Sequence, residues 1–246
     1  MKILIHGSTG RMGKILCELL TAGYPGLELA ARVSPEEIAD PANCVYTTLS
    51  EVDCDVECVI DFSHHTAVHS LMEFCIARNL PVVVSTTGHT PEEKAVIAAA
   101  SEKIPVFFSA NMSIGVALVA ELAKKAASVF PDANIEIVEK HHNQKLDVPS
   151  GTALLLAHRI QEALTDSVLL VGRHENGKRT AKEIGIHSLR LGNEVGTHEI
   201  IITTGAETIT LKHEAENRSL FANGALAAAA FLAGKPAGMY SMRNII

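Results

Sequence analysis

The sequence predicts an α/β protein in two parts, a doubly wound parallel sheet and a second α+β domain with an open mixed sheet. Up to about residue 111, apolar runs of strand length alternate with segments of helical periodicity, as in a parallel sheet whose strands are joined by helices. The runs are continuous, which is typical of strands that helices cover on both faces. Beyond residue 111, strand-like segments follow one another directly, and this change predicts the second domain.

Strands and helices are expected to alternate in the first part. The expected strands are Lys2–Ile5, Leu27–Ala31, Cys58–Phe62, Val82–Ser85 and Val106–Phe108. Amphipathic segments between them predict helices at Gly13–Leu20, Ala67–Arg78 and Pro91–Ala100.

The second part is expected to begin with a helix and to continue as a sheet. Its first elements are a helix from Ser113 to Phe130, a strand at Asn134–Glu139 and a helix from Gly151 to about Leu164. Three strands of an antiparallel meander are expected next, at Ile184–Leu191, His198–Thr204 and Thr208–His213, because the breaks Gly192-Asn193 and Gly205-Ala206 have the composition of turns. An Ala-rich helix from Ser219 to about Leu232 comes last.

Composition excludes several classes of function. The chain has 246 residues, 28 acidic against 21 basic side chains, only 4% aromatic residues and no Trp. It therefore lacks both the positive charge and the stacking surface of a nucleic-acid binder. No apolar stretch reaches the roughly 18 residues of a membrane span, so no membrane partner is expected. The five cysteines show no paired spacing, which favours free thiols in the cytoplasm.

A glycine motif follows the first strand directly. Gly7 would permit a tight turn, Gly10 would let the backbone approach a pyrophosphate, and Gly13 would let helix and strand pack closely. Their position between a buried strand and a helix indicates a Rossmann-type dinucleotide site. A glycine-rich turn in an α/β protein that binds no nucleotide is the alternative.

The end of the second strand bears on the choice of cofactor. An acidic residue often stands there to bind a ribose hydroxyl, but this chain has Arg32 and Ser34, which suit a 2′-phosphate and favour NADPH. Glu36 and Glu37 are near enough to leave NADH open, and Arg32 is equally consistent with a solvated strand end.

The stretch from Glu139 to Ala153 carries the groups suited to chemistry. A strand ends in His141 and His142, Lys145 follows, and Pro-Ser before Gly151 and Thr152 begins a helix. Histidine suits proton donation near neutral pH, and a helix N-terminus with a lysine beside it suits a carboxylate. For each histidine taken singly, a solvated loop residue or a metal ligand is the alternative.

A metal site is not expected. His65 and His69 are four residues apart on a predicted helix and would suit half of a zinc site. No acidic or cysteine pattern nearby completes it, and the chain contains no HExxH motif.

Over essentially its whole length, the chain resembles the dihydrodipicolinate reductase (4-hydroxy-tetrahydrodipicolinate reductase) family of the diaminopimelate route to lysine. The run His-His-x-x-Lys-x-Asp-x-Pro-Ser-Gly-Thr from His141 to Thr152 is the most specific feature. The other matching segments are Gly7–Gly13, Asp61–Ser63, Ser85–Gly88, Ser109–Gly115, Arg190–Gly192, Val195–His198 and Arg218–Ala225.

The resemblance implies an NAD(P)H-dependent reduction of a small cyclic dicarboxylate, with residues 1–111 and 222–246 binding the dinucleotide and 112–221 serving substrate binding and homotetramer formation. By position, His141 would be the general acid, Lys145 would share proton donation and substrate anchoring, and His142, Gly151 and Thr152 would bind substrate. The cofactor would be lined by Gly7, Ser8, Thr9, Gly10, Arg11, Met12, Ser85, Thr86, Thr87, Ser109, Ala110, Asn111 and Met112.

Three departures from the family pattern concern the cofactor. Met112 stands where an aromatic residue is common, Ser85 stands where glycine is common, and the second strand lacks the usual acid. A protein of the same fold that senses NAD(P) without catalysis is the alternative function. The presence of both His141 and Lys145 favours the enzyme, because a sensor needs neither.

Overall fold

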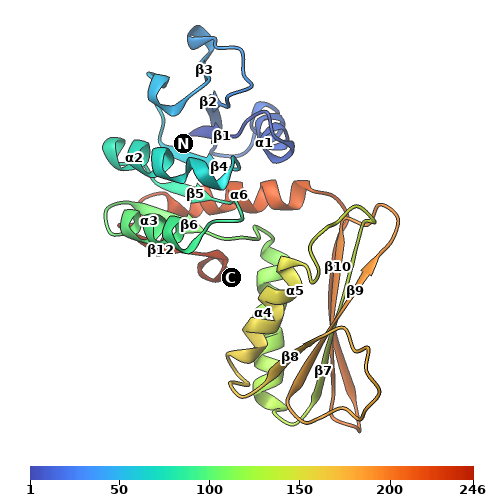
Figure 1. The fold of residues 1–246 in the computed structure, drawn as a ribbon. Helices are drawn as coiled ribbons and strands as arrows, with labels where there is room; N and C mark the ends of the chain where they lie inside the picture. Colours follow the sequence, from blue (N-terminus) through green and yellow to red (C-terminus); the bar gives the residue numbers. More distant parts are fainter. The chain divides into compact units, whose positions relative to one another are not determined.

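The computed structural model describes residues 1–246, and the chain divides into two compact units (Figure 1). Unit 1 consists of Met1–Ser113 and Ser219–Ile246, and unit 2 of Ile114–Arg218. The chain therefore leaves unit 1 once, builds unit 2, and returns to complete unit 1.

Unit 1 contains a seven-stranded sheet in which every neighbouring pair is parallel. The strand order β12-β6-β5-β4-β1-β2-β3 places β1 and β4 side by side, with the chain running outward on either side of them. This pair marks the switch point, where α/β proteins of this kind bind ligands beyond the carboxyl ends of the strands. The strands are β1 (Lys2–His6), β2 (Glu28–Val33), β3 (Val45–Tyr46), β4 (Cys58–Asp61), β5 (Val82–Val84), β6 (Pro105–Phe108) and β12 (Gly238–Tyr240).

Helices cover both faces of this sheet, as the continuous apolar strands predict. Helix α1 packs with α6, which also contacts β4, β5 and β6, while α2 packs with α3. The residues of β4 and β5 are all buried. The helices are α1 (Arg11–Thr21), α2 (Val68–Arg78), α3 (Pro91–Ser101) and α6 (Ser219–Leu232), and four short 3₁₀ turns are η1 (Pro41–Asn43), η2 (Leu49–Glu51), η3 (His65–Ala67) and η4 (Met242–Asn244).

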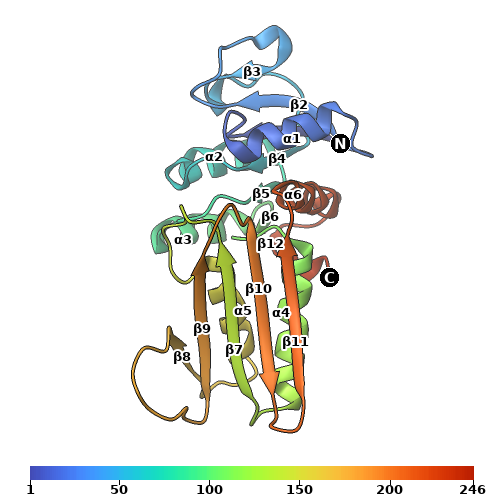
Figure 2. The same cartoon turned by 90° about the vertical axis from the view of Figure 1, so that its right-hand side faces the viewer.

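Unit 2 is an open five-stranded mixed sheet with two helices on one face. Figure 2 shows β9, β7, β10 and β11 side by side, with α4 and α5 behind them. In the order β11-β10-β7-β9-β8, β10 is antiparallel to both neighbours and the other pairs are parallel. The elements are α4 (Ile114–Val129), β7 (Asn134–His141), α5 (Gly151–Gln161), β8 (Val168–Val171), β9 (Glu183–Arg190), β10 (Gly196–Thr203) and β11 (Thr208–Ala215).

The expected antiparallel meander of β9, β10 and β11 is wrong, because β7 lies between β9 and β10. Only β10 and β11 form a hairpin. The connection after β9 crosses the end of β7 instead of turning tightly: Leu191 N–H donates to His141 O (2.9 Å) and His142 N–H donates to Glu194 O (2.8 Å). The pairing of β7 with β9 and β10 therefore outweighs the turn-forming composition of Gly192-Asn193. It brings β9, the connection after it and β10 together at the end of β7.

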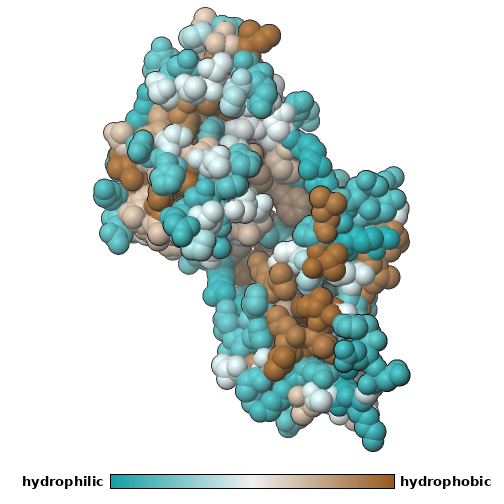
Figure 3. All heavy atoms as spheres, in the orientation of Figure 1, coloured by the Kyte–Doolittle hydropathy of each residue, from teal (hydrophilic) through white to brown (hydrophobic).

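Apolar side chains remain exposed on the helix side of unit 2, where Figure 3 shows them gathered. Ile114, Leu118 and Leu122 on α4, and Leu146 and Val148 in the loop before α5, are all at least 40% exposed. No helix of the protein combines the length and the apolar character needed to cross a membrane.

Candidate functional site

The glycine turn after β1 has the geometry that the motif predicts. Gly7 has φ +85°, and a Cβ there would lie 2.6 Å from Phe62 O. A Cβ on Gly13, in the first turn of α1, would lie 2.1 Å from Gly7 O. Both positions therefore require glycine, one for the turn and one for close packing of α1 on the turn.

A hollow of about 370 Å³ lies beside this turn at the carboxyl edge of the sheet. The turn after β1 and the segments that follow β2 and β4 line it: Gly7, Thr9, Gly10, Ser34, Pro35, Glu36, Phe62, Ser63, His64, Thr66 and Ala67. These are the elements that hold the adenosine half of a dinucleotide at a switch point. The hollow therefore fits the dinucleotide that the glycine motif predicts.

Glu36 stands at the wall of this hollow. Its Oε2 accepts hydrogen bonds from the hydroxyls of Thr9 (2.9 Å) and Ser34. These two hydrogen bonds, Ser34 first, lower the pKa of the Glu36 carboxyl below its ordinary value. The Glu36 carboxylate therefore lies just past β2, two residues beyond Ser34.

Arg32 is placed differently from the residues that line the hollow. Its side chain is 42% exposed, and its Nε lies 4.0 Å from Glu37 Oε1. Glu37 also accepts a hydrogen bond from Ser8 Oγ at 2.8 Å. Of the two residues expected to meet a 2′-phosphate, only Ser34 lines the hollow, and its hydroxyl donates to Glu36.

A buried carboxylate joins the ends of β1, β4 and the segment after β5. Asp61 accepts from His6 Nδ1 (2.8 Å), Ser63 Oγ (2.6 Å) and Thr86 Oγ1 (2.6 Å). Burial raises the pKa of Asp61, but the hydrogen bond and charge of His6 and the two hydroxyls outweigh it and lower the pKa. Asp61 therefore fixes Thr86, one of the predicted cofactor residues, at the carboxyl edge.

The other predicted cofactor segments follow β5 and β6 at the same edge. Ser85 N–H donates to Asp61 O (3.0 Å), and the buried hydroxyl of Ser85 has no hydrogen-bond partner within the protein. Ser109 Oγ donates to Asn111 O at 2.6 Å. Met112 is buried, and its carbonyl would lie 1.7 Å from a Cβ on Gly224, so α6 approaches this segment only because residue 224 is glycine.

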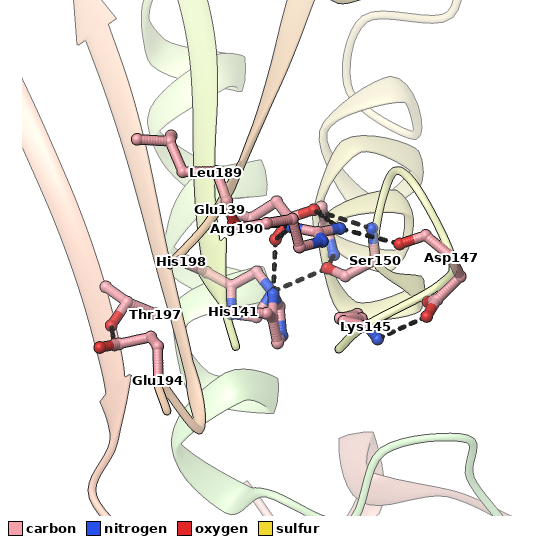
Figure 4. Close-up of polar contacts among 11 residues, drawn as sticks. Glu139, His141, Lys145, Asp147, Ser150, Leu189, Arg190, Glu194, Thr197 and His198 are labelled. Carbon is pink, nitrogen blue, oxygen red and sulfur yellow. Dashed lines mark hydrogen bonds and ion pairs between the residues drawn. The ribbon is translucent and has the colours of Figure 1, made fainter. Parts of the chain in front are cut away.

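In unit 2, His141 is the last residue of β7, and Glu139 shares its face of the sheet because side chains alternate along a strand. His141 Nδ1 donates to Glu139 Oε2 at 2.5 Å. Arg190 on β9 is paired with His141 in the register of the sheet. Its guanidinium donates two hydrogen bonds, of 2.8 and 2.9 Å, to the same Glu139 carboxylate (Figure 4). Burial raises the pKa of Glu139, but the bonds from His141 and Arg190 prevail and hold it well below its usual range.

A second histidine, His198 on β10, packs edge-on against His141 with ring centres 5.1 Å apart. Its Nε2 is hydrogen-bonded to Ser150 Oγ (3.0 Å), and its buried Nδ1 has no partner. Burial, and then the nearby His141, lower the pKa of His198 to about 3. His198 is therefore a neutral side chain beside His141 at ordinary pH.

The loop between β7 and α5 carries the remaining predicted residues. Ser150 caps α5 by accepting from Ala153 N–H (3.1 Å), so Gly151 and Thr152 lie in the first turn of α5, where backbone N–H groups point out of the end of the helix. Lys145 Nζ lies 2.8 Å from Asp147 Oδ1. Its charge is the last of the causes that lower the pKa of His198, after burial and the charge of His141.

No group of three or more His, Cys, Asp or Glu side chains in the structure is arranged to hold a metal ion. His65 lies in η3, just before α2, and its Nδ1 is 2.9 Å from Glu93 Oε1. The His65 ring is therefore hydrogen-bonded to Glu93, and it does not stand as half of a zinc site.

Sequence reasoning did not identify Glu139, Arg190, Ser150 and His198 as site residues. Glu139 had a detectable signal, because an acid two residues before His141 on a strand lies on the same buried face. Arg190 and His198 come from strands 51 and 59 residues further along, counted from Glu139, and only the pairing of the sheet brings them to it.

Comparisons with known families cover both units. The family description "Dihydrodipicolinate reductase, N-terminus" matches residues 1–112, and "Dihydrodipicolinate reductase, C-terminus" matches residues 115–246. A protein named 4-hydroxy-tetrahydrodipicolinate reductase from Caldanaerobacter subterraneus subsp. tengcongensis is 42% identical, with 100% of this chain and 98% of the relative covered. A protein of the same name from Clostridium tetani is also 42% identical, over 98% and 95% of the two chains.

Solved structures give a consistent result. The dipicolinate-bound dihydrodipicolinate reductase from Paenisporosarcina sp. TG-14 matches with a TM-score of 0.81 and 26% identity, over 100% of this chain and 99% of that one. The diaminopimelate dehydrogenase of C. glutamicum matches with a TM-score of 0.58 at 14% identity, which is a likeness of fold alone.

Proposed function

From the premise that the chain belongs to the dihydrodipicolinate reductase family, we propose that it reduces 4-hydroxy-tetrahydrodipicolinate to tetrahydrodipicolinate with NAD(P)H, in the biosynthesis of diaminopimelate and lysine. The 4-hydroxyl leaves as water, and the product keeps the hydride from the nicotinamide and one proton. The family makes the protein an oxidoreductase. Residues 1–111 and 222–246 would bind the dinucleotide, and residues 112–221 the substrate.

The observation that carries the proposal is the arrangement at the end of β7. One buried carboxylate holds His141, a lysine lies on the adjoining loop, and the first turn of α5 begins beside them. A dicarboxylate acceptor needs cationic and N–H groups to bind its charges, and a proton donor once it has been reduced. The relatives from Caldanaerobacter subterraneus and Clostridium tetani are named for such a substrate.

Each residue has a distinct part in the proposed reaction. When bound, the nicotinamide supplies the hydride. Lys145 and the N–H groups of Gly151 and Thr152 bind substrate carboxylate, and His142 extends this binding surface. His141 protonates the reduced substrate through Nε2, because its Nδ1 is engaged by Glu139. His198 remains neutral. It therefore places no second positive charge beside His141, which must itself be protonated to act as the proton donor.

The dinucleotide would lie on the carboxyl edge of unit 1. The turn Gly7–Met12 and the hollow beside Thr9 and Gly10 fit its adenosine and pyrophosphate. The unpaired buried hydroxyl of Ser85 and the segment Ser109–Met112 lie further along the same edge, where the nicotinamide half would bind.

For the choice of cofactor, the geometry supports NADH over the NADPH that Arg32 and Ser34 favour in the sequence. Glu36 lines the hollow as a carboxylate and would accept a hydrogen bond from a ribose hydroxyl. A 2′-phosphate in the same place would meet that negative charge. Arg32 is turned toward Glu37 and does not line the hollow.

Unit 2 also supports the proposed homotetramer. Ile114, Leu118 and Leu122 are exposed at intervals of four residues, which places them along one face of α4. Apolar side chains that gather on a surface mark protein contacts. Light scattering tests the assembly: a molar mass four times that of the 26.2 kDa chain is expected, and a monomer would contradict it.

The reductase is distinguished from a catalytically inactive NAD(P)-binding protein by a coupled assay. The unstable substrate is generated in situ by the enzyme that makes it, and loss of the reduced-nicotinamide absorbance is followed. We expect loss that depends on both substrate and protein. Binding of the dinucleotide without any consumption would favour the sensor instead.

A further inference from the structure

Glu139 is a buried acid that the roles above leave unexplained. It is fully buried near the end of β7, and a buried acidic side chain is rare unless it is paired. Arg190 grips both of its oxygens, and Ser150 N–H adds a bond of 3.2 Å to Oε1. With the bond from His141 Nδ1, donors from β7, β9 and the start of α5 converge on one carboxylate.

This arrangement determines what His141 can do. An ionised carboxylate only accepts hydrogen bonds, so Nδ1 of His141 must carry a proton in every state of the ring. The remaining nitrogen, Nε2, is then the atom that gains and loses the proton. The ring is also held in orientation, because Glu139 itself cannot move while Arg190 and Ser150 hold it.

Arg190 extends the arrangement to the loop that carries Lys145. Its Nη2 donates to Asp147 O at 2.8 Å, while Asp147 Oδ1 is the partner of Lys145 Nζ. One guanidinium thus links the acid behind His141 to the segment that presents the lysine.

We propose that Glu139, clamped by Arg190, is the positioning residue of the site: it fixes the tautomer and orientation of His141 and stabilises the imidazolium form that donates the proton. This inference deepens the proposed function and rests on it. The charged and titratable groups around His141 are Glu139 on its own strand, Arg190 on β9, His198 on β10 and Lys145 on the following loop.

The same strand offers a matched control on its other face. Glu136, three residues before Glu139, accepts from His187 Nε2 (2.8 Å) and from Arg179. It is therefore also a carboxylate held by one histidine and one arginine, but it lies on the face of the sheet opposite to His141. Glu136→Gln removes a comparable charge without touching the site.

The experiment compares Glu139→Gln with Glu136→Gln in the full-length protein. For Glu139→Gln we expect kcat to fall about 100-fold, the dinucleotide affinity to stay unchanged, and the basic limb of the kcat pH profile to move to lower pH, because the imidazolium loses its carboxylate partner. Glu136→Gln should keep the wild-type kcat and profile. Equal losses in both variants, in step with their thermal stability, would mean a structural role only and would overturn the proposal.

A spectroscopic readout separates failure of this inference from failure of the proposed function. Nitrogen-15 NMR of the wild-type histidines reports which ring nitrogen of His141 carries the proton, whether or not the protein turns over. We expect neutral His141 to be protonated at Nδ1 in the wild type and to lose this preference in Glu139→Gln. A neutral ring protonated at Nε2 in the wild type would overturn the positioning role even if the reductase activity is present.

Discussion

Gly196 on β10 lies directly against the ring of His141: a Cβ built on it would be 2.9 Å from Nε2. The backbone of Gly196 is not in the left-handed region, so alanine is compatible with its conformation. Glycine is therefore needed there for space beside the atom that we assign to proton transfer, and not for a turn.

Gly196→Ala should consequently impair proton donation while leaving the fold intact. We expect a fall in kcat of about tenfold or more, since a displaced general acid loses part of a contribution of about 10²- to 10⁴-fold. Steady-state kinetics measures it. Gly238→Ala on β12 is the control, because its Cβ would be at an ordinary 3.4 Å from the Tyr240 hydroxyl; an equal loss in both variants would refute the argument.

Glu36→Gln should shift cofactor preference toward NADPH. Removing the charge at the wall of the hollow removes the repulsion of a 2′-phosphate, and we expect the ratio of kcat/KM for NADPH to that for NADH to rise about tenfold, or about 1.4 kcal/mol.

Arg32→Ala is the matched variant. It tests the competing hypothesis that Arg32 determines a preference for NADPH. Because Arg32 does not line the hollow, the same ratio should stay within about twofold of wild type. A loss of NADPH activity in Arg32→Ala would restore Arg32 as the determinant and contradict the role of Glu36.

Two glycines of the same turn should respond differently to alanine. A Cβ on Gly13 would lie 2.1 Å from Gly7 O, so Gly13→Ala should lower the free energy of unfolding of unit 1 by about 1–3 kcal/mol and weaken dinucleotide binding. A Cβ on Gly10 is 3.2 Å from Gly7 O, and Gly10→Ala should weaken binding with little loss of stability. Denaturation and titration calorimetry measure the two effects; equal loss of stability in both would be inconsistent with these roles.

Acid should destabilise the protein through His198. In the unfolded chain the imidazole binds a proton below about pH 6.5, but in the folded protein its pKa is about 3. The unfolded state therefore binds more protons between these values, and stability falls as the pH is lowered, by at most about 1.4 kcal/mol per pH unit from this residue.

His198→Gln should make stability less dependent on pH in that window. The measurement is the free energy of unfolding by denaturant between about pH 5 and about pH 7. His89 and His213 also have lowered pKa values through burial and remain in the variant, so the slope should shrink without vanishing. An unchanged slope would show that His198 does not contribute.

The parallel sheet of unit 1 was predictable because each central strand carries its own signal. Residues such as Ile3–Ile5 and Val82–Val84 are buried on both faces, so their apolar runs are continuous. The strands that sequence reasoning missed are short or lie at sheet edges: β3 has two residues, and β8 exposes Val168 and Val171. These strands form because they pair with a neighbouring strand, so their own composition gives little signal that they are strands.

The candidate site was predictable where it is local in the chain. His141, Lys145 and the start of α5 lie within one short segment, and the structure keeps them together. The partners that hold His141 depend on β7 entering the sheet between β9 and β10, which the turn residues at Gly192-Asn193 gave no reason to expect. For the same reason, Arg190 appeared only as part of a motif and not as the clamp on Glu139.

The central claim is that His141 protonates a substrate that is reduced at the expense of NAD(P)H. The most direct test is substrate-dependent oxidation of the dinucleotide by wild type, His141→Ala and Lys145→Ala, with dinucleotide binding measured on each. We expect turnover in the wild type, a loss of about 10²-fold or more in His141→Ala, a marked loss in Lys145→Ala, and unchanged binding in both. Wild-type turnover in His141→Ala would contradict this claim.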